Sequence, residues 1–91
     1  MDFEWDRAKS DATFDLRGFD FAYSARVFVD EFRLEHEDLR RDYGERRYQT
    51  IGEIEGRTYF VVYTVRGRQL RIISARRAHK HEDRAYRQSQ I

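Results

Sequence analysis

Two consecutive β-rich runs constrain the fold of this chain more than any other feature. Arg57–Arg66 and Gln69–Arg76 are dominated by β-branched and aromatic residues, which fit a pleated, half-buried surface. In the short turn between them, Gly67 can take the positive φ that a tight hairpin requires. A second turn, Glu55-Gly56, joins Arg46–Ile54 to the first run. The sequence therefore predicts three antiparallel strands in a meander.

Helical patterns precede this meander. Asp6 and Asp20 are good N-caps for helices over Arg7–Arg17 and Phe21–Val29, and Gly18 is a good residue to end the first helix. We expect the two helices to form a hairpin that lies on the sheet. Their expected buried residues are Ala8, Ala12 and Leu16 in the first helix, and Ala22, Ala25, Phe28 and Val29 in the second.

The remaining segments are a charged tail and two short extended stretches. The tail, Arg77–Gln90, has helix-forming composition but few apolar residues, so it lines a functional surface or docks on a partner. Met1–Trp5 is predicted as an edge strand or an extended arm. Charge dominates Phe32–Asp42, which favours a solvated edge strand or loop around Leu34–Leu39. Residues 1–91 are thus expected to form one α+β domain with two N-terminal helices, an antiparallel sheet of three or slightly more strands, and a C-terminal helix.

Two-residue turns would sort the side chains of the meander into two faces. The face expected against the main core carries Ile51, Phe60, Val62, Ile73 and Ala75, with Arg47, Thr64 and Arg71 toward one end. The other face mixes apolar with polar side chains and is expected to meet a polar partner. Its members are Val61, Val65, Leu70, Ile72, Tyr48, Tyr59, Tyr63, Ser74 and Arg76.

Composition excludes some functions and favours others. The chain has no cysteine, so disulfides and thiolate metal sites are excluded, and no apolar run approaches the length of a membrane span. We expect a cytoplasmic protein with no membrane partner. Residues 1–45 carry seven basic and thirteen acidic side chains, whereas residues 46–91 carry eleven and four. A basic half favours a phosphate-rich partner, although the two halves can also neutralise each other within the fold.

Short motifs throughout nearly the whole chain point to a family. They include Phe3-Glu4-Trp5-Asp6, Ala8-Lys9, Gly18-Phe19-Asp20-Phe21, Val27-Phe28, Arg47-Tyr48, Ile51-Gly52 and Val62-Tyr63-Thr64. The most specific is Arg71-Ile72-Ile73-Ser74-Ala75-Arg76-Arg77-Ala78, followed by Glu82 and Tyr86. In these residues the chain resembles the BrnT family of bacterial type II toxins, which are small ribonucleases with a RelE-like fold.

The resemblance implies a metal-independent endoribonuclease that needs no cofactor and arrests translation and growth. It also implies two partners: an RNA substrate, and a cognate ribbon-helix-helix antitoxin through which alone operator DNA is contacted. In such enzymes the 2′-hydroxyl of the RNA attacks the adjacent phosphorus, so the site needs a base, an acid and cations. Arg71 and Arg76 are the candidate cations, because a guanidinium matches phosphate oxygens. The two arginines are predicted on opposite faces, which favours Arg76 at the phosphate.

Candidates for proton transfer lie in the tail. They are His79, Lys80, His81, Glu82 and Tyr86, although single surface histidines are usually inert, and the residues do not decide which of Lys80, Glu82 and Tyr86 is acid and which is base. Glu82 can equally be a surface charge that pairs with Arg84, Arg87 or Tyr86. His79 and His81, two positions apart, are expected to face apart and to form no metal pair. No metal site is predicted.

Further residues are candidates for binding RNA: Arg17, Arg66, Tyr63 and Arg77. Tyr48, Tyr59 and Tyr63 can stack on bases, or can instead complete a small core.

One position departs from the family pattern. The first helix ends in Leu16-Arg17-Gly18 where the family usually has Lys-His-Gly, and arginine cannot cycle a proton near neutral pH. The alternative function is therefore a weakened or inactive member that only binds RNA or the antitoxin.

Overall fold

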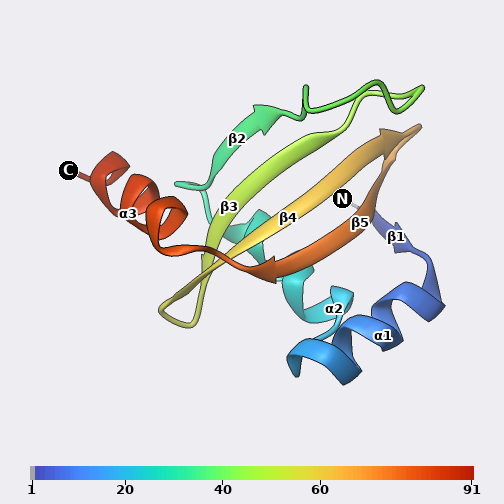
Figure 1. Cartoon of the computed structure of the whole chain (residues 1–91), viewed down its shortest axis with the longest axis horizontal. Helices are drawn as coiled ribbons and strands as arrows, with labels where there is room; N and C mark the ends of the chain where they lie inside the picture. The colour runs from blue at the N-terminus through green and yellow to red at the C-terminus, as the bar shows by residue number, and fades with distance from the viewer. Residues whose placement is uncertain (1) are drawn as a thin grey trace.

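The three predicted strands form the centre of a larger sheet. In the computed structural model, which describes residues 2–91, they are β3 (Tyr48–Ile54), β4 (Arg57–Arg66) and β5 (Gln69–Arg77), and neighbours pair antiparallel (Figure 1). Ile54 pairs with Arg57, and Arg66 pairs with Gln69, so both turns have the two-residue loops that were predicted. The positive φ of Gly56 and Gly67 allows these tight turns.

Two edge strands extend the sheet to five, in the order β1-β5-β4-β3-β2. β2 (Leu34–Glu37) pairs antiparallel with β3, which confirms an edge strand in the charged segment. β1 (Asp2–Trp5) also lies at an edge, but it pairs parallel to β5. The sheet is therefore mixed, and the expectation of an entirely antiparallel sheet was wrong. Met1, the first residue of that predicted strand, lies outside the described residues.

The predicted helices form with the predicted caps. α1 (Arg7–Arg17) begins at Asp6, whose carboxylate accepts from the Lys9 N–H, and ends at Gly18 with φ 84°. After the N-cap Asp20 the chain makes only one α-helical turn, α2 (Phe21–Ser24). It then tightens into a 3₁₀ helix, η1 (Ala25–Val29), where an α-helix was predicted. α3 (Lys80–Ser89) follows β5 and crosses the opposite face of the sheet from α1 and α2 (Figure 1).

The main core lies on the sheet face that was predicted to be open. Phe21 and Val27 pack there on Tyr59, Val61 and Ile72, all almost completely buried. The face that carries Ile51, Phe60 and Val62 holds a smaller cluster instead, closed by Tyr86 of α3. The assignment of the two faces was wrong because polar tyrosines were taken as a sign of exposure, whereas Tyr59 and Tyr63 are buried.

A β-bulge in β5 accounts for part of that error. Val62 pairs with Ser74 and Tyr63 pairs with Ile72, so Ile73 has no partner of its own. One extra residue reverses the side-chain alternation of the strand beyond it. Arg76 consequently lies on the same face as Arg71, and not on the opposite face as predicted, while Ala75 joins the main core.

The register of α1 also differs from the expectation. Ala8, Ala12 and Leu16 are exposed, Leu16 to 76%, and the residue that α1 buries is Ser10. The Ser10 hydroxyl accepts a hydrogen bond from the Phe21 N–H at 3.0 Å, which joins the two helices. In η1 the tighter helix buries Ala25 and Val27 and leaves Val29 exposed. Among residues 2–91, no helix is long and apolar enough to cross a membrane.

Gly52 tests the packing of η1 on the sheet. A Cβ at this position would lie 2.9 Å from the Cβ of Val27 and 3.1 Å from its carbonyl oxygen. We expect Gly52→Ala to lower the free energy of unfolding by about 1–3 kcal/mol, as overpacking does. Urea denaturation measures the change, with Gln49→Ala on the same strand as control. Equal stability of Gly52→Ala and wild type would contradict this packing.

Candidate functional site

The N-terminus of α3 is held to the sheet by one ion pair. Arg76 donates from Nη1 and Nη2 to the two carboxylate oxygens of Glu82, at 2.8 and 2.9 Å. The guanidinium also lies over the ring of Phe60, 4.1 Å from its centroid. Glu82 accepts from the backbone N–H of His79 at 2.7 Å, which completes a capping box. The structure thus places two predicted site residues, Arg76 and Glu82, in direct contact as an ion pair.

The environment of Glu82 keeps it ionised. Only 11% of its side chain is exposed. Burial would raise the pKa of Glu82, but the hydrogen bonds from Arg76 and from the His79 N–H lower it below its usual value. A carboxyl group with these partners serves as a fixed anion and not as a proton donor at neutral pH. This favours a positioning role for Glu82.

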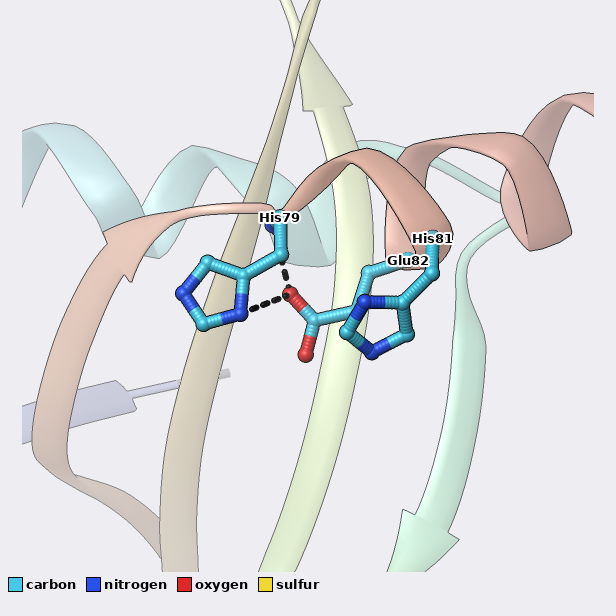
Figure 2. A group of neighbouring side chains, drawn as sticks. All are labelled: His79, His81 and Glu82. Atoms are coloured by element: carbon cyan, nitrogen blue, oxygen red, sulfur yellow. Dashed lines mark hydrogen bonds and ion pairs between the residues drawn. The ribbon is translucent and has the colours of Figure 1, made fainter.

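The two histidines lie together, contrary to expectation. Their ring centroids are 5.9 Å apart, because His79 is the extended N-cap of α3 and does not follow the helical spacing that places His81 (Figure 2). Figure 2 shows the Glu82 carboxylate directed toward the His79 ring, whose Nδ1 is 3.9 Å from Oε1. Two exposed imidazoles beside a carboxylate are side chains able to transfer protons to and from a substrate.

The same three side chains have the spacing of a metal site. Ligand atoms of His79, His81 and Glu82 lie within 4.8 Å of one another. However, Glu82 already accepts three hydrogen bonds, two of them from a cationic guanidinium. The positive end of the α3 dipole lies at the same place, which favours an anion over a cation. The donor set therefore fits a phosphate group better than a metal ion.

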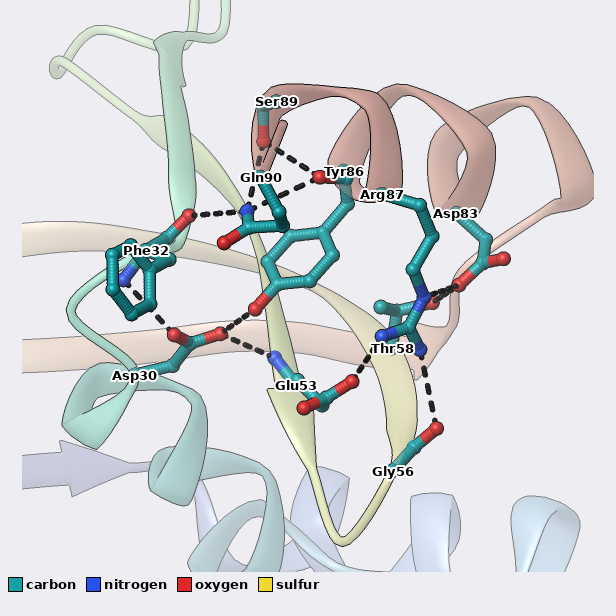
Figure 3. Close-up of polar contacts among 10 residues, drawn as sticks. All are labelled: Asp30, Phe32, Glu53, Gly56, Thr58, Asp83, Tyr86, Arg87, Ser89 and Gln90. Carbon is teal, nitrogen blue, oxygen red and sulfur yellow. Dashed lines mark hydrogen bonds and ion pairs between the residues drawn. The ribbon is translucent and has the colours of Figure 1, made fainter.

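Tyr86 lies one turn further along α3 and is tied to the protein. Its hydroxyl donates to Asp30 Oδ2 at 2.5 Å, and the same carboxylate accepts from the backbone N–H groups of Glu53 and Phe32 (Figure 3). Burial and the hydrogen bond to Asp30 raise the pKa of Tyr86 well above its usual value. Tyr86 is buried and protonated, which suits an anchor of α3 better than a catalytic acid or base.

Other residues of α3 make further contacts with the sheet. Arg87 donates to Glu53 and to the Gly56 carbonyl, and Asp83 accepts from the Thr58 hydroxyl at 2.8 Å (Figure 3). Gln90 donates to the Phe32 carbonyl at the end of the helix. The polar tail that lacked an apolar face is thus fixed to the protein by hydrogen bonds and ion pairs.

A basic pocket of about 410 Å³ opens where the end of α1, the β3–β4 turn and the end of β5 meet. Arg17, Arg57 and Arg77 line it, and none of them has a carboxylate within ion-pair distance among the described residues. Arg77 lies over the ring of Tyr59, 5.6 Å from its centroid. Two of the predicted RNA-binding residues, Arg17 and Arg77, therefore lie in one pocket with a third arginine.

A second hollow of about 330 Å³ continues this basic surface toward α3. Arg57 and Arg77 line both hollows, and Lys80 lines the second. Lys80 lies between His79 and His81 in the sequence. We call the surface formed by Arg17, Arg57, Arg77 and Lys80 the basic track.

The structure separates the remaining predicted site residues from the track. Arg66 and Arg71 lie toward the β4–β5 turn, at the other end of β4 and β5, and pair with Glu45 at 3.5 Å and Glu4 at 3.8 Å. Arg71 and Arg76 are five positions apart along β5, about 16 Å at ~3.3 Å per residue. Tyr63 is only 6% exposed and packs on Phe28, so its ring cannot stack on a base.

Sequence reasoning missed Arg57 and the proximity of the His79 and His81 rings. Arg57 follows the Glu55-Gly56 turn directly, and pairing across this turn places it at the same end of the sheet as Arg77. That signal was present in the predicted meander. The position of His79 at the start of the helix was also a detectable signal, because a capping box needs Glu three residues after the cap.

Comparison with known proteins identifies a family. Residues 5–82 match the model of a family described as the ribonuclease toxin, BrnT, of a type II toxin–antitoxin system. The match includes the basic track, Arg76, both histidines and Glu82, and ends before Tyr86. No curated protein matches the chain.

The Arg76–Glu82 pair makes stability depend on pH in a defined direction. Because the folded-state pKa of Glu82 is lowered, its contribution is present above the unfolded-state pKa and is lost as the pH falls through the folded-state pKa. We expect Glu82→Gln to reduce the free energy of unfolding by about 1–3 kcal/mol at pH 7, and by progressively less below pH ~4. Urea denaturation across this pH range measures the difference. Glu37→Gln, on the exposed edge strand, is the control, and a pH-independent difference would contradict the prediction.

Proposed function

This chain belongs to the BrnT family of ribonuclease toxins of type II toxin–antitoxin systems, and on that basis we propose that it is a metal-independent endoribonuclease. In this proposal the fold is of the RelE-like type, and the enzyme cleaves cellular RNA in the cytoplasm and thereby inhibits translation and growth. A ribbon-helix-helix antitoxin neutralises it and connects the complex to operator DNA.

The basic track is the observation that carries the proposal. Three guanidiniums gather around one pocket, and none of the three has a carboxylate within ion-pair distance among residues 2–91. Like charges held together repel, and a polyanion relieves that repulsion. An RNA backbone that follows Arg17, Arg57, Arg77 and Lys80 passes beside the start of α3. His79 and His81 flank Lys80 of the track at the start of α3, and we assign proton transfer to them.

The chemistry follows from these positions. One imidazole takes the proton of the 2′-hydroxyl as the 2′-oxygen attacks the adjacent phosphorus, and the bond to the 5′-oxygen breaks. The other imidazole gives a proton to the departing 5′-oxygen, which leaves a 2′,3′-cyclic phosphate and a 5′-hydroxyl. Arg77 and Lys80 stabilise the charge of the phosphorane. Arg76 and Glu82 position the start of α3, and Glu82 also orients His79.

Arginine variants test the track. We expect Arg57→Ala and Arg77→Ala each to weaken binding of a single-stranded RNA, and to reduce the slope of log K against log salt by about 0.7 per lost phosphate contact. Fluorescence anisotropy with a labelled oligoribonucleotide at several salt concentrations measures both quantities. Arg68→Ala is a matched control, because Arg68 is an exposed arginine in the β4–β5 turn at the opposite end of the strands. A weakening by Arg68→Ala as large as that by Arg77→Ala would contradict the track.

Histidine variants test the chemistry. We expect the purified protein to cleave single-stranded RNA in EDTA, and His79→Ala and His81→Ala each to reduce the rate by about 10²-fold or more, because each removes a proton-transfer group. His36→Ala, on the edge strand β2, should leave the rate unchanged. Gel analysis of the products measures the rate and identifies the cyclic phosphate.

The outcomes separate the proposal from the alternative. Loss of cleavage in EDTA with restoration by a divalent metal would overturn the metal-independent mechanism. An inactive wild-type protein that still binds RNA or the antitoxin would instead support a non-catalytic module. Arg17 would then be the first residue to examine as the cause of the lost activity.

A further inference from the structure

The basic pocket is lined by aromatic and acidic side chains as well as arginines, and binding of an RNA phosphate backbone does not require these. Its volume of about 410 Å³ is within the range of small-ligand pockets and suits one nucleotide, not a duplex. The pocket lies at the junction of α1 and α2, between the αL cap Gly18 and the N-cap Asp20. Phosphate contacts alone need only exposed cations, so a hollow with other side chains suggests a more specific ligand.

One wall of the pocket presents aromatic rings. Tyr59 and Tyr23 pack edge to face in the wall, with ring centroids 5.8 Å apart. Phe14, from the last turns of α1, also lines the pocket and is 55% exposed. An exposed ring in a pocket rich in arginine is the arrangement on which an unstacked base can lie.

A single carboxylate lies among these arginines. Asp20 Oδ1 accepts from the Tyr23 N–H at 2.8 Å and caps α2, while Oδ2 has no hydrogen-bond donor among the described residues. A ligand that satisfies the pocket must therefore offer both a phosphate for the guanidiniums and an N–H donor for Asp20. Adenine, cytosine and guanine offer an exocyclic amine, whereas the donor of uracil is N3–H, which lies between two carbonyl oxygens that a carboxylate repels.

We propose that this pocket binds one unstacked nucleotide of a single-stranded RNA. The base lies on Phe14, an exocyclic amine donates to Asp20 Oδ2, and the phosphate contacts Arg57 and Arg77. The identity of the ligand as RNA rests on the proposed function, but the binding itself does not depend on cleavage. The pocket makes the protein selective for single strands, because a paired and stacked base cannot enter it.

Mononucleotides test the pocket directly in the full chain. We expect 5′-AMP, 5′-CMP and 5′-GMP to shift the backbone amide NMR signals of the residues around Phe14 and Asp20. Ribose 5-phosphate should bind about fiftyfold or more weakly, because it lacks both the stacking base and the amine. UMP should bind about tenfold more weakly than the amine-bearing nucleotides, because it has no exocyclic amine and its N3–H lies between two carbonyl oxygens that the Asp20 carboxylate repels.

Two variants assign the roles within the pocket. Phe14→Ala should weaken AMP binding about fivefold or more, because the ring on which the base stacks is lost, and its exposed position leaves the core intact. Asp20→Asn keeps a good N-cap for α2 and should abolish the preference over UMP. Arg68→Ala should change neither affinity.

The failure of this inference is distinguishable from that of the proposed function. If AMP and ribose 5-phosphate bind equally, or if the shifts map away from Phe14 and Asp20, the pocket assignment is overturned even where RNA is cleaved. If AMP binds as expected and no RNA is cleaved, the pocket assignment stands and the proposed chemistry fails.

Discussion

The β-bulge at Ile73 decides what the last strand presents on each face of the protein. Because Ile73 has no partner between the pairs Val62–Ser74 and Tyr63–Ile72, every later side chain of β5 changes face. Ala75 enters the main core, Arg76 reaches α3, and Arg77 lies over Tyr59 in the basic pocket. Without the extra residue, Arg76 would lie in the pocket, and Arg77 would face α3. The bulge thus separates a structural arginine from one that is free for a ligand.

The attachment of α3 depends on this arrangement. The helix contributes one buried ring, Tyr86, to the smaller cluster, and hydrophobic contact of that size cannot position a helix alone. The first turn of α3 is held by the ion pair between Arg76 and Glu82. Its middle is held by hydrogen bonds of Asp83 with Thr58 and of Arg87 with the Gly56 carbonyl, and Tyr86 donates to Asp30. These contacts also fix the histidines at the helix start. A substitution at Arg76 or Glu82 therefore disturbs the histidines even if neither residue touches RNA.

Local patterns predicted the elements better than they predicted the faces. The hairpin turns, the caps Asp6 and Asp20, and the edge strand in the charged segment formed as expected, because short-range chemistry determines each of them. Which face became the core depended on where α1, α2 and η1 packed, and on a bulge with no distinctive residue. The parallel pairing of β1 with β5 is likewise a long-range choice. Tyr63 shows the consequence, since its hydroxyl suggested exposure but bonds to Glu35 while the ring is buried.

The candidate site follows the same division. Arg17 and Arg77 were identified from the resemblance, but that they share a pocket with Arg57 results from three chain segments meeting at one end of the sheet. Arg17 acquires a physical meaning there. Its guanidinium adds permanent positive charge to the pocket and, unlike an imidazole, does not exchange protons with a substrate. In the proposed mechanism, His79 and His81, which flank Lys80 of the track, supply the proton transfer instead.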